Sequence, residues 1–522
     1  MNQVFEQRLG SLLARSDIFL AGGKRGVEKE SLRVTSDGYL AQTPHPQGLG
    51  SALTNHFITT DFSEALLEFV TPALGSTWEA LQIVCDIHQF THGQLGDELL
   101  WCASMPCRLP ADAEIPLARY GDSNVGRMKT IYRRGLGHRY GRNMQTIAGV
   151  HFNYSLPESF WDVYREILGE DADEREFRSR HYLALVRNFR RYGWIVLYLF
   201  GASPALCKSF GRGRDLSMPE LDAETWYEPY GTSLRMSDLG YNNQTQAGIS
   251  ISLNRLDEYI RDLSEAIRTP EPAYEKFGVI RNGEYQQLST NKLQIENEYY
   301  SPIRPKRVAR SGERPTAALR RGGIEYVEIR SLDLNVSDPA GINQNTMRFI
   351  EAFLIYCVLE DSPPFDAESF EEALQNQSLT AKRGREPGIR LRRNGQPLAL
   401  SAWAREIVEK VAAVAELVDR HEEDGCYREA VALVASQVAE PETTPSARLL
   451  QELRDSKSSF FEFALDLARR HRRYFSSIAP MPPERARQLQ TEATESLRRQ
   501  REIEAADDLN FEEYLARYFA TG

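Results

Sequence analysis

Near its N-terminus the chain reads Gly26-Val27-Glu28-Lys29-Glu30, which places two carboxylates two residues apart in a strand-like sequence. Residues i and i+2 of a strand point to the same face of a sheet. We therefore expect Glu28 and Glu30 to project together. Taken alone, the pair is also consistent with a solvated strand face, so its interpretation depends on whether the pattern recurs.

The pattern recurs in two later stretches, each with polar side chains two residues apart among apolar and aromatic neighbours. Gly149-Val150-His151-Phe152-Asn153-Tyr154 pairs His151 with Asn153, and Ile324-Glu325-Tyr326-Val327-Glu328-Ile329-Arg330 pairs Glu328 with Arg330. Each also has a simpler interpretation, as a core histidine or as an ion pair. Acid, imidazole and guanidinium groups on one buried face are costly unless they are paired or hold an ion. Because carboxylate oxygens suit Mg²⁺ shared with nucleotide phosphates, the three stretches together predict an active-site sheet.

The order of the predicted elements favours an α+β fold. Strand-like sequence dominates residues 17–75, helical spacing follows over 77–97, and residues 347–359 read as a buried helix. From residue 401 onward helix-forming residues prevail, with breaks at prolines. Strands first and helices last indicate α+β rather than a doubly wound sheet. We expect a catalytic core over residues 1–400 and a helical region over 401–522.

Composition excludes several classes of partner. Lys plus Arg number 63 and Asp plus Glu 74, a net charge of −11. Nucleic acid is therefore not an expected partner, because phosphate backbones require a basic surface. No apolar run approaches the roughly 18 residues of a membrane span. We expect no membrane association and a cytoplasmic location.

The six cysteines contain no C-x-x-C pair, so we expect reduced thiols and an activity that needs no disulfide. The common P-loop, dinucleotide-binding, hydrolase and metalloprotease motifs are absent. His88 and His92 lie four residues apart on a predicted helix. Because no carboxylate stands at a matching spacing, we interpret them as surface or half-buried histidines rather than as metal ligands.

Longer stretches of the chain carry a resemblance to a known family. They include RGVEKESLR (25–33), ITTDFSEALLEF (58–69), QTIAGVHFN (145–153), YLFGASP (198–204), SLRMSDLGY (233–241), LQIENEYYSPIRPKR (293–307) and GGIEYVEIRSLD (322–333). Together they resemble bacterial glutamate–cysteine ligase of the proteobacterial type. The similarity weakens toward the C-terminus, most of all after residue 375.

The resemblance implies a fold and a reaction. The fold would be like that of glutamine synthetase and the guanido kinases, a curved antiparallel sheet that forms an active-site cradle. The enzyme would use ATP to join the γ-carboxylate of L-glutamate to the amine of L-cysteine through γ-glutamyl phosphate, the first step of glutathione synthesis. It also implies two or three Mg²⁺ ions, with Mn²⁺ as an alternative, feedback inhibition by glutathione, and a monomer.

The resemblance also implies roles for residues that match the family's motifs. Arg133 and Arg330 would contact the transferring phosphoryl group or a substrate carboxylate. Arg304 and Lys306, with neighbouring Arg307, would bind the nucleotide. The implied metal ligands are Glu28, Glu30, Asp61, Glu68, His151 and Glu328. The implied substrate-binding residues are Tyr132, Gln145, Asn153, Arg235, Tyr241 and Tyr300, of which the three tyrosines would form the cysteine pocket.

Three other interpretations are weighed against this one. A ligase of the same fold with another amine acceptor would change the pocket at Tyr132, Tyr241 or Tyr300, and a tyrosine stands at each. A catalytically inactive metabolite sensor would be expected to lose metal-binding carboxylates, and none is lost. A fused glutathione synthetase is disfavoured because residues 401–522 are short and helical for a second nucleotide-binding domain.

Overall fold

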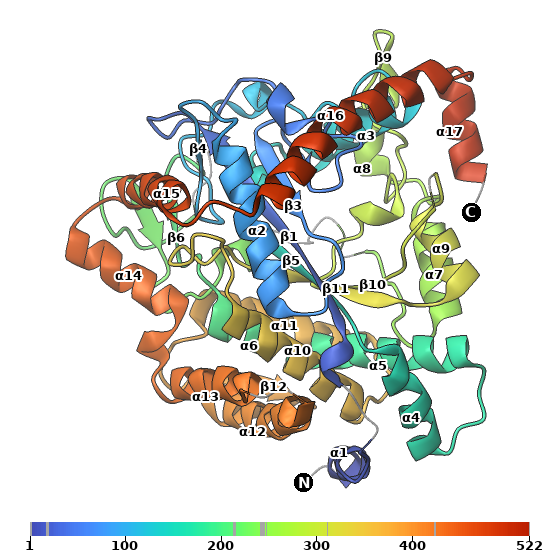
Figure 1. The fold of residues 1–522 in the computed structure, drawn as a ribbon, viewed down its shortest axis with the longest axis vertical. Helices are drawn as coiled ribbons and strands as arrows, with labels where there is room; N and C mark the ends of the chain where they lie inside the picture. The colour runs from blue at the N-terminus through green and yellow to red at the C-terminus, as the bar shows by residue number, and fades with distance from the viewer. Residues whose placement is uncertain are drawn as a thin grey trace.

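The computed structural model describes residues 3–16, 20–211, 216–240, 246, 248–310, 312–421 and 424–520. One antiparallel sheet lies at its centre, and helices surround it (Figure 1). The strand order is β10-β11-β5-β1-β3-β2, and β4 also pairs with β1. The strands are β1 Lys24–Val34, β2 Ile58–Thr60, β3 Leu66–Val70, β4 Leu99–Leu100, β5 Val150–Ser155, β10 Ile303–Lys306 and β11 Tyr326–Leu332.

Every pairing in this sheet is antiparallel. Three smaller two-stranded sheets lie outside it. The prediction of an α+β class is confirmed. The additional strands are β6 Ala205–Cys207 with β7 Thr225–Tyr227, β8 Ile280–Arg281 with β9 Glu284–Tyr285, and β12 Arg390–Arg393 with β13 Gln396–Ala399.

The helices follow the predicted order, with the last third of the described chain almost wholly helical. The helix predicted over 77–97 is α2, and the one predicted over 347–359 is the C-terminal part of α10. The helices are α1 Gln3–Leu13, α2 Thr77–His92, α3 Asn124–Tyr140, α4 Glu158–Leu168, α5 Glu174–Tyr192, α6 Trp194–Phe200, α7 Leu256–Ala266, α8 Pro272–Glu275, α9 Pro315–Gly322, α10 Gln344–Leu359, α11 Ala367–Arg383, α12 Leu400–Val418, α13 Cys426–Ala439, α14 Pro445–Ser456, α15 Phe460–Ser477, α16 Pro483–Ala506 and α17 Phe511–Ala520.

One face of β1 packs against helices, and this fixes which face is left for a site. Arg25 is buried and forms an ion pair of 2.6 Å with Glu351 of α10, and Tyr427 of α13 donates a 2.7 Å hydrogen bond to the same carboxylate. Lys29, on the same face, lies 3.1 Å from His88 of α2. Side chains alternate along a strand, so Glu28 and Glu30 face away from these helices.

The C-terminal helices run along the outside of the sheet. Figure 1 shows α16 crossing near α2 and leading toward α3, where α17 turns downward. Leu489 of α16 is buried in a cluster with Ile83 and Ile87 of α2. Phe511 and Leu515 of α17 are buried against α3. Within the described residues, no helix is long and apolar enough to span a bilayer.

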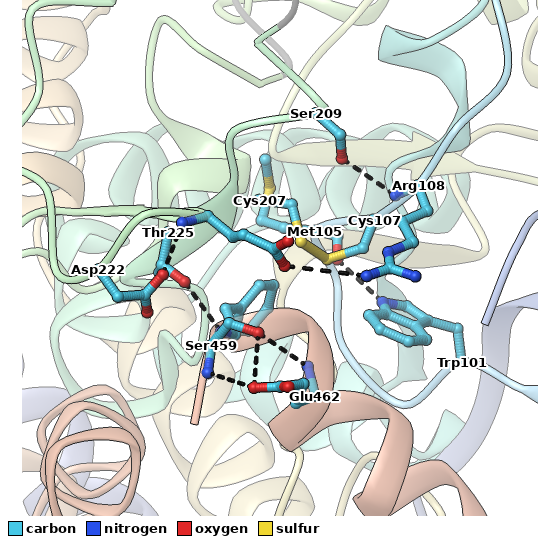
Figure 2. The surroundings of a disulfide bond; sticks show 12 residues. Trp101, Met105, Cys107, Arg108, Cys207, Ser209, Asp222, Thr225, Ser459 and Glu462 are labelled. Atoms are coloured by element: carbon cyan, nitrogen blue, oxygen red, sulfur yellow. Dashed lines mark hydrogen bonds and ion pairs between the residues drawn. A yellow bond between two sulfur atoms is a disulfide. The ribbon is translucent and has the colours of Figure 1, made fainter. Parts of the chain in front are cut away.

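The prediction that all six cysteines are reduced is wrong. Cys107 and Cys207 form a disulfide, with their Cα atoms 5.4 Å apart (Figure 2). The bridge joins the segment after β4 to the end of β6, and the backbone N–H of Arg108 donates a hydrogen bond of 3.0 Å to Ser209 beside it. The two cysteines lie 100 residues apart in the chain, so no local spacing motif predicts the pair. The other cysteines, Cys85, Cys102, Cys357 and Cys426, are free.

Candidate active site

Strand register brings the predicted polar residues into rows across the sheet. Glu28 of β1 lies opposite His151 of β5, and Glu30 lies opposite Glu68 of β3. Glu328 of β11 lies opposite Asn153 on one side, and opposite Arg304 of β10 on the other. Directly opposed residues of an antiparallel pair project to the same face with their Cβ atoms about 4.5–5.5 Å apart.

The centre of this face is a cluster of carboxylates around one imidazole. His151 Nδ1 lies 3.1 Å from Glu28 Oε2, and its Nε2 lies 3.7 Å from Glu30 Oε1. Asn153 donates a 2.8 Å hydrogen bond to the other oxygen of Glu28. One ligand atom from each of Glu28, Glu68 and His151 falls within 4.8 Å of the other two.

The pKa values of the carboxylates in this cluster indicate a site that a cation would stabilise. Burial, and then the charges of Glu28, Asp61 and Glu30, hold the pKa of Glu68 well above its ordinary value. Burial also raises the pKa of Glu30. At Glu28 burial again opposes ionisation, but the hydrogen bond from His151 and the charges of His151 and Lys306 together lower the pKa. Packed carboxylates with one imidazole fit a hard divalent cation, which would relieve their mutual repulsion.

Glu328 stands beside this cluster within a ring of cations. Its carboxylate lies 3.4 Å from Lys306, 3.4 Å from Arg330 and 3.9 Å from Arg304. Burial opposes ionisation, but these cations hold the pKa of Glu328 well below its ordinary value. Its Oε2 is buried and accepts no hydrogen bond within the described part of the chain. The basic residues predicted on β10 and β11 therefore meet the acids at the same place.

A cavity of about 850 Å³ opens beside the cluster. Asp61, at the end of β2, lies on its wall with Arg133 of α3, and the two side chains approach to 3.7 Å. Nine of the predicted site residues line the cavity: Asp61, Tyr132, Arg133, Gln145, Tyr300, Arg304, Lys306, Arg307 and Arg330.

Arg235 lies beside β11, the strand that carries Glu328 and Arg330. It is buried, donates a 2.9 Å hydrogen bond to the carbonyl of Arg330, and lies 3.9 Å from Asp333. A Cβ at position 149 would come within 2.2 Å of its guanidinium, so Gly149 permits this approach. Tyr300 donates to the sulfur of Met236 at 3.3 Å. Tyr241 lies outside the described residues.

Sequence reasoning missed one wall of the cavity, the inward face of α3. Of its residues only Tyr132 and Arg133 were predicted, whereas Lys129, Arg139 and Tyr140 also line the cavity. The spacing of 129, 132, 133, 136 and 140 is that of one helix face, which is the signal that would have found them. A second missed residue is Glu298, which is buried and forms a 2.8 Å ion pair with Arg139.

Carboxylates on a sheet, with arginines and lysines around them and a cavity beside them, are typical of a class of protein, the enzymes that transfer phosphoryl groups. The comparisons specify the family. Residues 11–380 match the glutamate–cysteine ligase family. The glutamate–cysteine ligase of Alcanivorax borkumensis is 49% identical over 98% of this chain and 99% of its own length, and that of Pseudomonas entomophila is 47% identical over 100% and 98%. The chain therefore belongs to the glutamate–cysteine ligase family.

Solved structures agree with this assignment. The glutamate–cysteine ligase of Francisella tularensis, determined in complex with AMP, superimposes with a TM-score of 0.91 at 35% identity, covering 97% of this chain and 99% of that one. A bifunctional glutathione synthetase from Pasteurella multocida gives a TM-score of 0.71 at 26% identity, covering 91% of this chain and 54% of that one.

Proposed function

We propose that the chain joins the γ-carboxylate of L-glutamate to the amine of L-cysteine at this cradle, with ATP as co-substrate. The products are γ-glutamylcysteine, ADP and phosphate, and the reaction is the first step of glutathione biosynthesis. The observation that carries the proposal is the cluster of Glu28, Glu68 and His151, with Glu328 and its ring of cations beside it, at the edge of a large cavity.

The chemistry explains why acids and cations meet here. A carboxylate is a poor acyl donor, because its leaving group would be oxide. Transfer of the γ-phosphoryl group makes an acyl phosphate, and phosphate leaves when the cysteine amine attacks. Two anions, the carboxylate and the nucleotide tail, must first approach each other. Fixed cations offset this repulsion and stabilise the charge of the transferring group, so no covalent protein nucleophile is needed.

The six carboxylate and imidazole residues supply the sites for Mg²⁺, with Mn²⁺ as an alternative. The bound ions would neutralise the phosphate charge and orient the nucleotide. Burial of so many acids on one face supports this role, because it is otherwise costly. The proposed ligands of two or three ions are Glu28, Glu30, Asp61, Glu68, His151 and Glu328.

The remaining residues divide by the group they would hold. Arg133 and Arg330 contact the transferring phosphoryl group, and Arg304 and Lys306 bind the nucleotide. The substrates are oriented by two sets of residues. Arg235, Gln145 and Asn153 hold glutamate, and Tyr132, Tyr241 and Tyr300 form the pocket for cysteine.

The proposal extends to the whole chain. The sheet is of the type found in glutamine synthetase and the guanido kinases, and residues 401–522 form a helical region packed on a catalytic core of residues 1–400. The enzyme works as a cytoplasmic monomer that glutathione inhibits.

Trapping of the acyl phosphate with hydroxylamine tests the function directly. ATP and glutamate with hydroxylamine should give γ-glutamyl hydroxamate, because hydroxylamine traps the acyl phosphate. Addition of cysteine should divert the product to γ-glutamylcysteine. If ATP cleavage does not depend on glutamate, the proposal is wrong.

The acceptor pocket gives a second prediction. The amine of cysteine attacks and the thiol does no chemistry, so 2-aminobutyrate, with a methyl in place of the thiol, should be an acceptor about 10–200-fold poorer than cysteine. Leucine and lysine should fail for steric reasons. Coupled ATP turnover at fixed glutamate measures each amine. Complete inactivity of 2-aminobutyrate would mean that the thiol takes a direct part in the reaction.

A further inference from the structure

The inward face of α3 presents more positive charge to the cavity than the proposed mechanism has used. Ser123 caps the helix by accepting a hydrogen bond of 3.2 Å from the Gly126 N–H, which fixes its N-terminus. Lys129 and Arg133 lie four residues apart, so they share a face, and both line the cavity. Arg133 has partners, since it contacts the side chain and the backbone carbonyl of Asp61.

Lys129 differs from Arg133 in having no hydrogen-bond or ion-pair partner among the described residues. Within the described ranges, its ammonium makes no hydrogen bond and no ion pair, and it lies 5.0 Å from the centre of the Tyr120 ring. Burial, and then the neighbouring charge of Arg133, lower the pKa of Lys129 to about 8, while Glu68 and Asp61 oppose this change. A half-buried cation with no anionic partner is costly, and an anion delivered by a ligand would offset that cost.

The position of Lys129 indicates which anion this is. The carboxylates that act on its ammonium are Glu68 and Asp61, both in the acid cluster. Lys129 lies one turn from Arg133 on the cavity-lining face of α3, and Arg133 contacts Asp61, a proposed metal ligand. Under the proposed function the metal ligands hold the phosphates of ATP, so the anion that comes next to Lys129 is the phosphoryl group passing from ATP to glutamate.

We propose that Lys129 is a catalytic residue whose ammonium binds the phosphoryl group during its transfer and then holds the departing phosphate. This inference rests on the proposed function. In the first step the bond from phosphorus to the ADP oxygen breaks, and a bond from phosphorus to the γ-carboxylate oxygen forms. Lys129 contributes charge and donates no proton. In the second step the amine nitrogen bonds to the acyl carbon and the acyl–oxygen bond breaks. Phosphate leaves with that electron pair and takes up the proton that the amine loses.

The test uses three variants of the full chain. Lys129→Met removes the charge and keeps most of the side-chain volume, and Lys129→Arg keeps the charge. Arg127→Met is the matched control, because Arg127 is on the same helix but is exposed, with its guanidinium 4.5 Å from the ring of Phe511. Thermal unfolding followed by circular dichroism establishes that each variant is folded.

The expected result separates a role in chemistry from a role in structure. Lys129→Met should lower the rate of hydroxamate formation without cysteine by about 100–1,000-fold, the usual effect of removing one preorganised charge. Lys129→Arg should recover part of this rate, and Arg127→Met should keep all of it. Calorimetry should show weaker binding of ATP by Lys129→Met but unchanged binding of AMP, which lacks the transferred group.

Three results would overturn the inference. One is normal hydroxamate formation by Lys129→Met, and another is equal loss of ATP and AMP binding. The third is a rise confined to the KM for cysteine, which would place Lys129 at the acceptor carboxylate. If the unmodified enzyme forms no glutamate-dependent hydroxamate, the proposed function itself fails, and this outcome is distinguishable from the other three.

Discussion

Glu328 is the residue on which the charge balance of the cradle depends, since three cations surround it. Glu328→Gln keeps the shape of the side chain but leaves those cations without their common acid. We expect kcat/KM to fall by at least about 100-fold while the fold survives. Steady-state turnover and thermal unfolding measure the two effects. Glu158→Gln is the control, because Glu158 is an exposed acid paired with Arg178. Near-normal turnover of the Glu328 variant would show that the cradle is misplaced.

Lys29 lies between two acids in the sequence but on the opposite face of the sheet. It is only 3% exposed, and its ammonium contacts Ser31 at 2.5 Å and His88 at 3.1 Å. Burial lowers its pKa from 10.5 to about 7. Between these values the unfolded chain binds a proton that the folded chain does not, so this residue makes stability rise with pH above about 7.

Lys29→Met should remove that dependence. From pH 7 to 9, the free energy of unfolding of the parent should rise relative to the variant by up to about 1.4 kcal/mol per pH unit. Urea titrations at several pH values measure it. Lys24→Met, at an exposed position on the same strand, should run parallel to the parent. If the difference in unfolding free energy between the parent and Lys29→Met stays constant across this range, the pKa of Lys29 is not lowered in the folded chain.

At this scale the sequence was informative because the strand period is local. The i, i+2 rule placed Glu28 with Glu30 and His151 with Asn153. It did not show that Glu68 lies opposite Glu30, because that depends on the register of β1 with β3. Register is set by long-range packing and turn geometry, which no single segment contains.

Among the elements that line the cavity, α3 was not predicted from the sequence. It is rich in basic residues and contains three glycines, so its apolar period is weak. The glycines have packing reasons: a Cβ at Gly126 would lie 2.3 Å from the carbonyl of Tyr120, and one at Gly135 would lie 2.2 Å from Gln294. The glycines allow α3 to approach its neighbours closely and form the cavity wall. They also weaken the helical periodicity of apolar residues by which the helix could have been predicted.

The bridge between Cys107 and Cys207 links the β4 segment to β6, and the hydrogen bonds nearby tie both to the site. Ser203, four residues before Cys207, donates a 2.7 Å hydrogen bond to Asp333, and Ser104 accepts one of 2.8 Å from the N–H of Leu334. A cross-link between residues 100 positions apart restricts the unfolded chain strongly.

Removal of the bridge should therefore lower stability. Cys107→Ser should reduce the free energy of unfolding by about 2–5 kcal/mol without reductant, and dithiothreitol should reduce the stability of the parent but not of the variant. Urea unfolding with and without reductant measures both changes. Cys85→Ser, at a free cysteine, is the control. Equal stability of parent and Cys107→Ser would show that the bridge does not form in solution.

For the whole molecule, the α+β class and the helical C-terminal region were predictable because they follow from periodicity and from proline breaks. The way in which residues 401–522 wrap the core was not, since it depends on contacts between residues far apart in sequence. Tyr427 of α13 reaches Glu351 of α10, and Leu489 of α16 packs with residues of α2 and β3. Ser496 of α16 accepts a 3.0 Å hydrogen bond from the Ser51 N–H.

These contacts predict that the proposed regions 1–400 and 401–522 unfold as one unit. The C-terminal region covers β1 through the Arg25–Glu351–Tyr427 contacts and supports α3 through Phe511. A fragment of residues 1–400 would expose this apolar surface and leave the buried charges with fewer partners. We expect the full chain to show one urea transition by fluorescence and by circular dichroism, and the fragment to show no cooperative transition and no glutamate-dependent ATP cleavage.

Tyr427→Phe, which removes the hydrogen bonds of the Tyr427 hydroxyl with Glu351 and Arg25, should cost about 1.5–3 kcal/mol and preserve the single transition. A fragment that melts sharply and binds ATP would show that the catalytic core is autonomous, and that the C-terminal helices are an appended region rather than part of its folding unit.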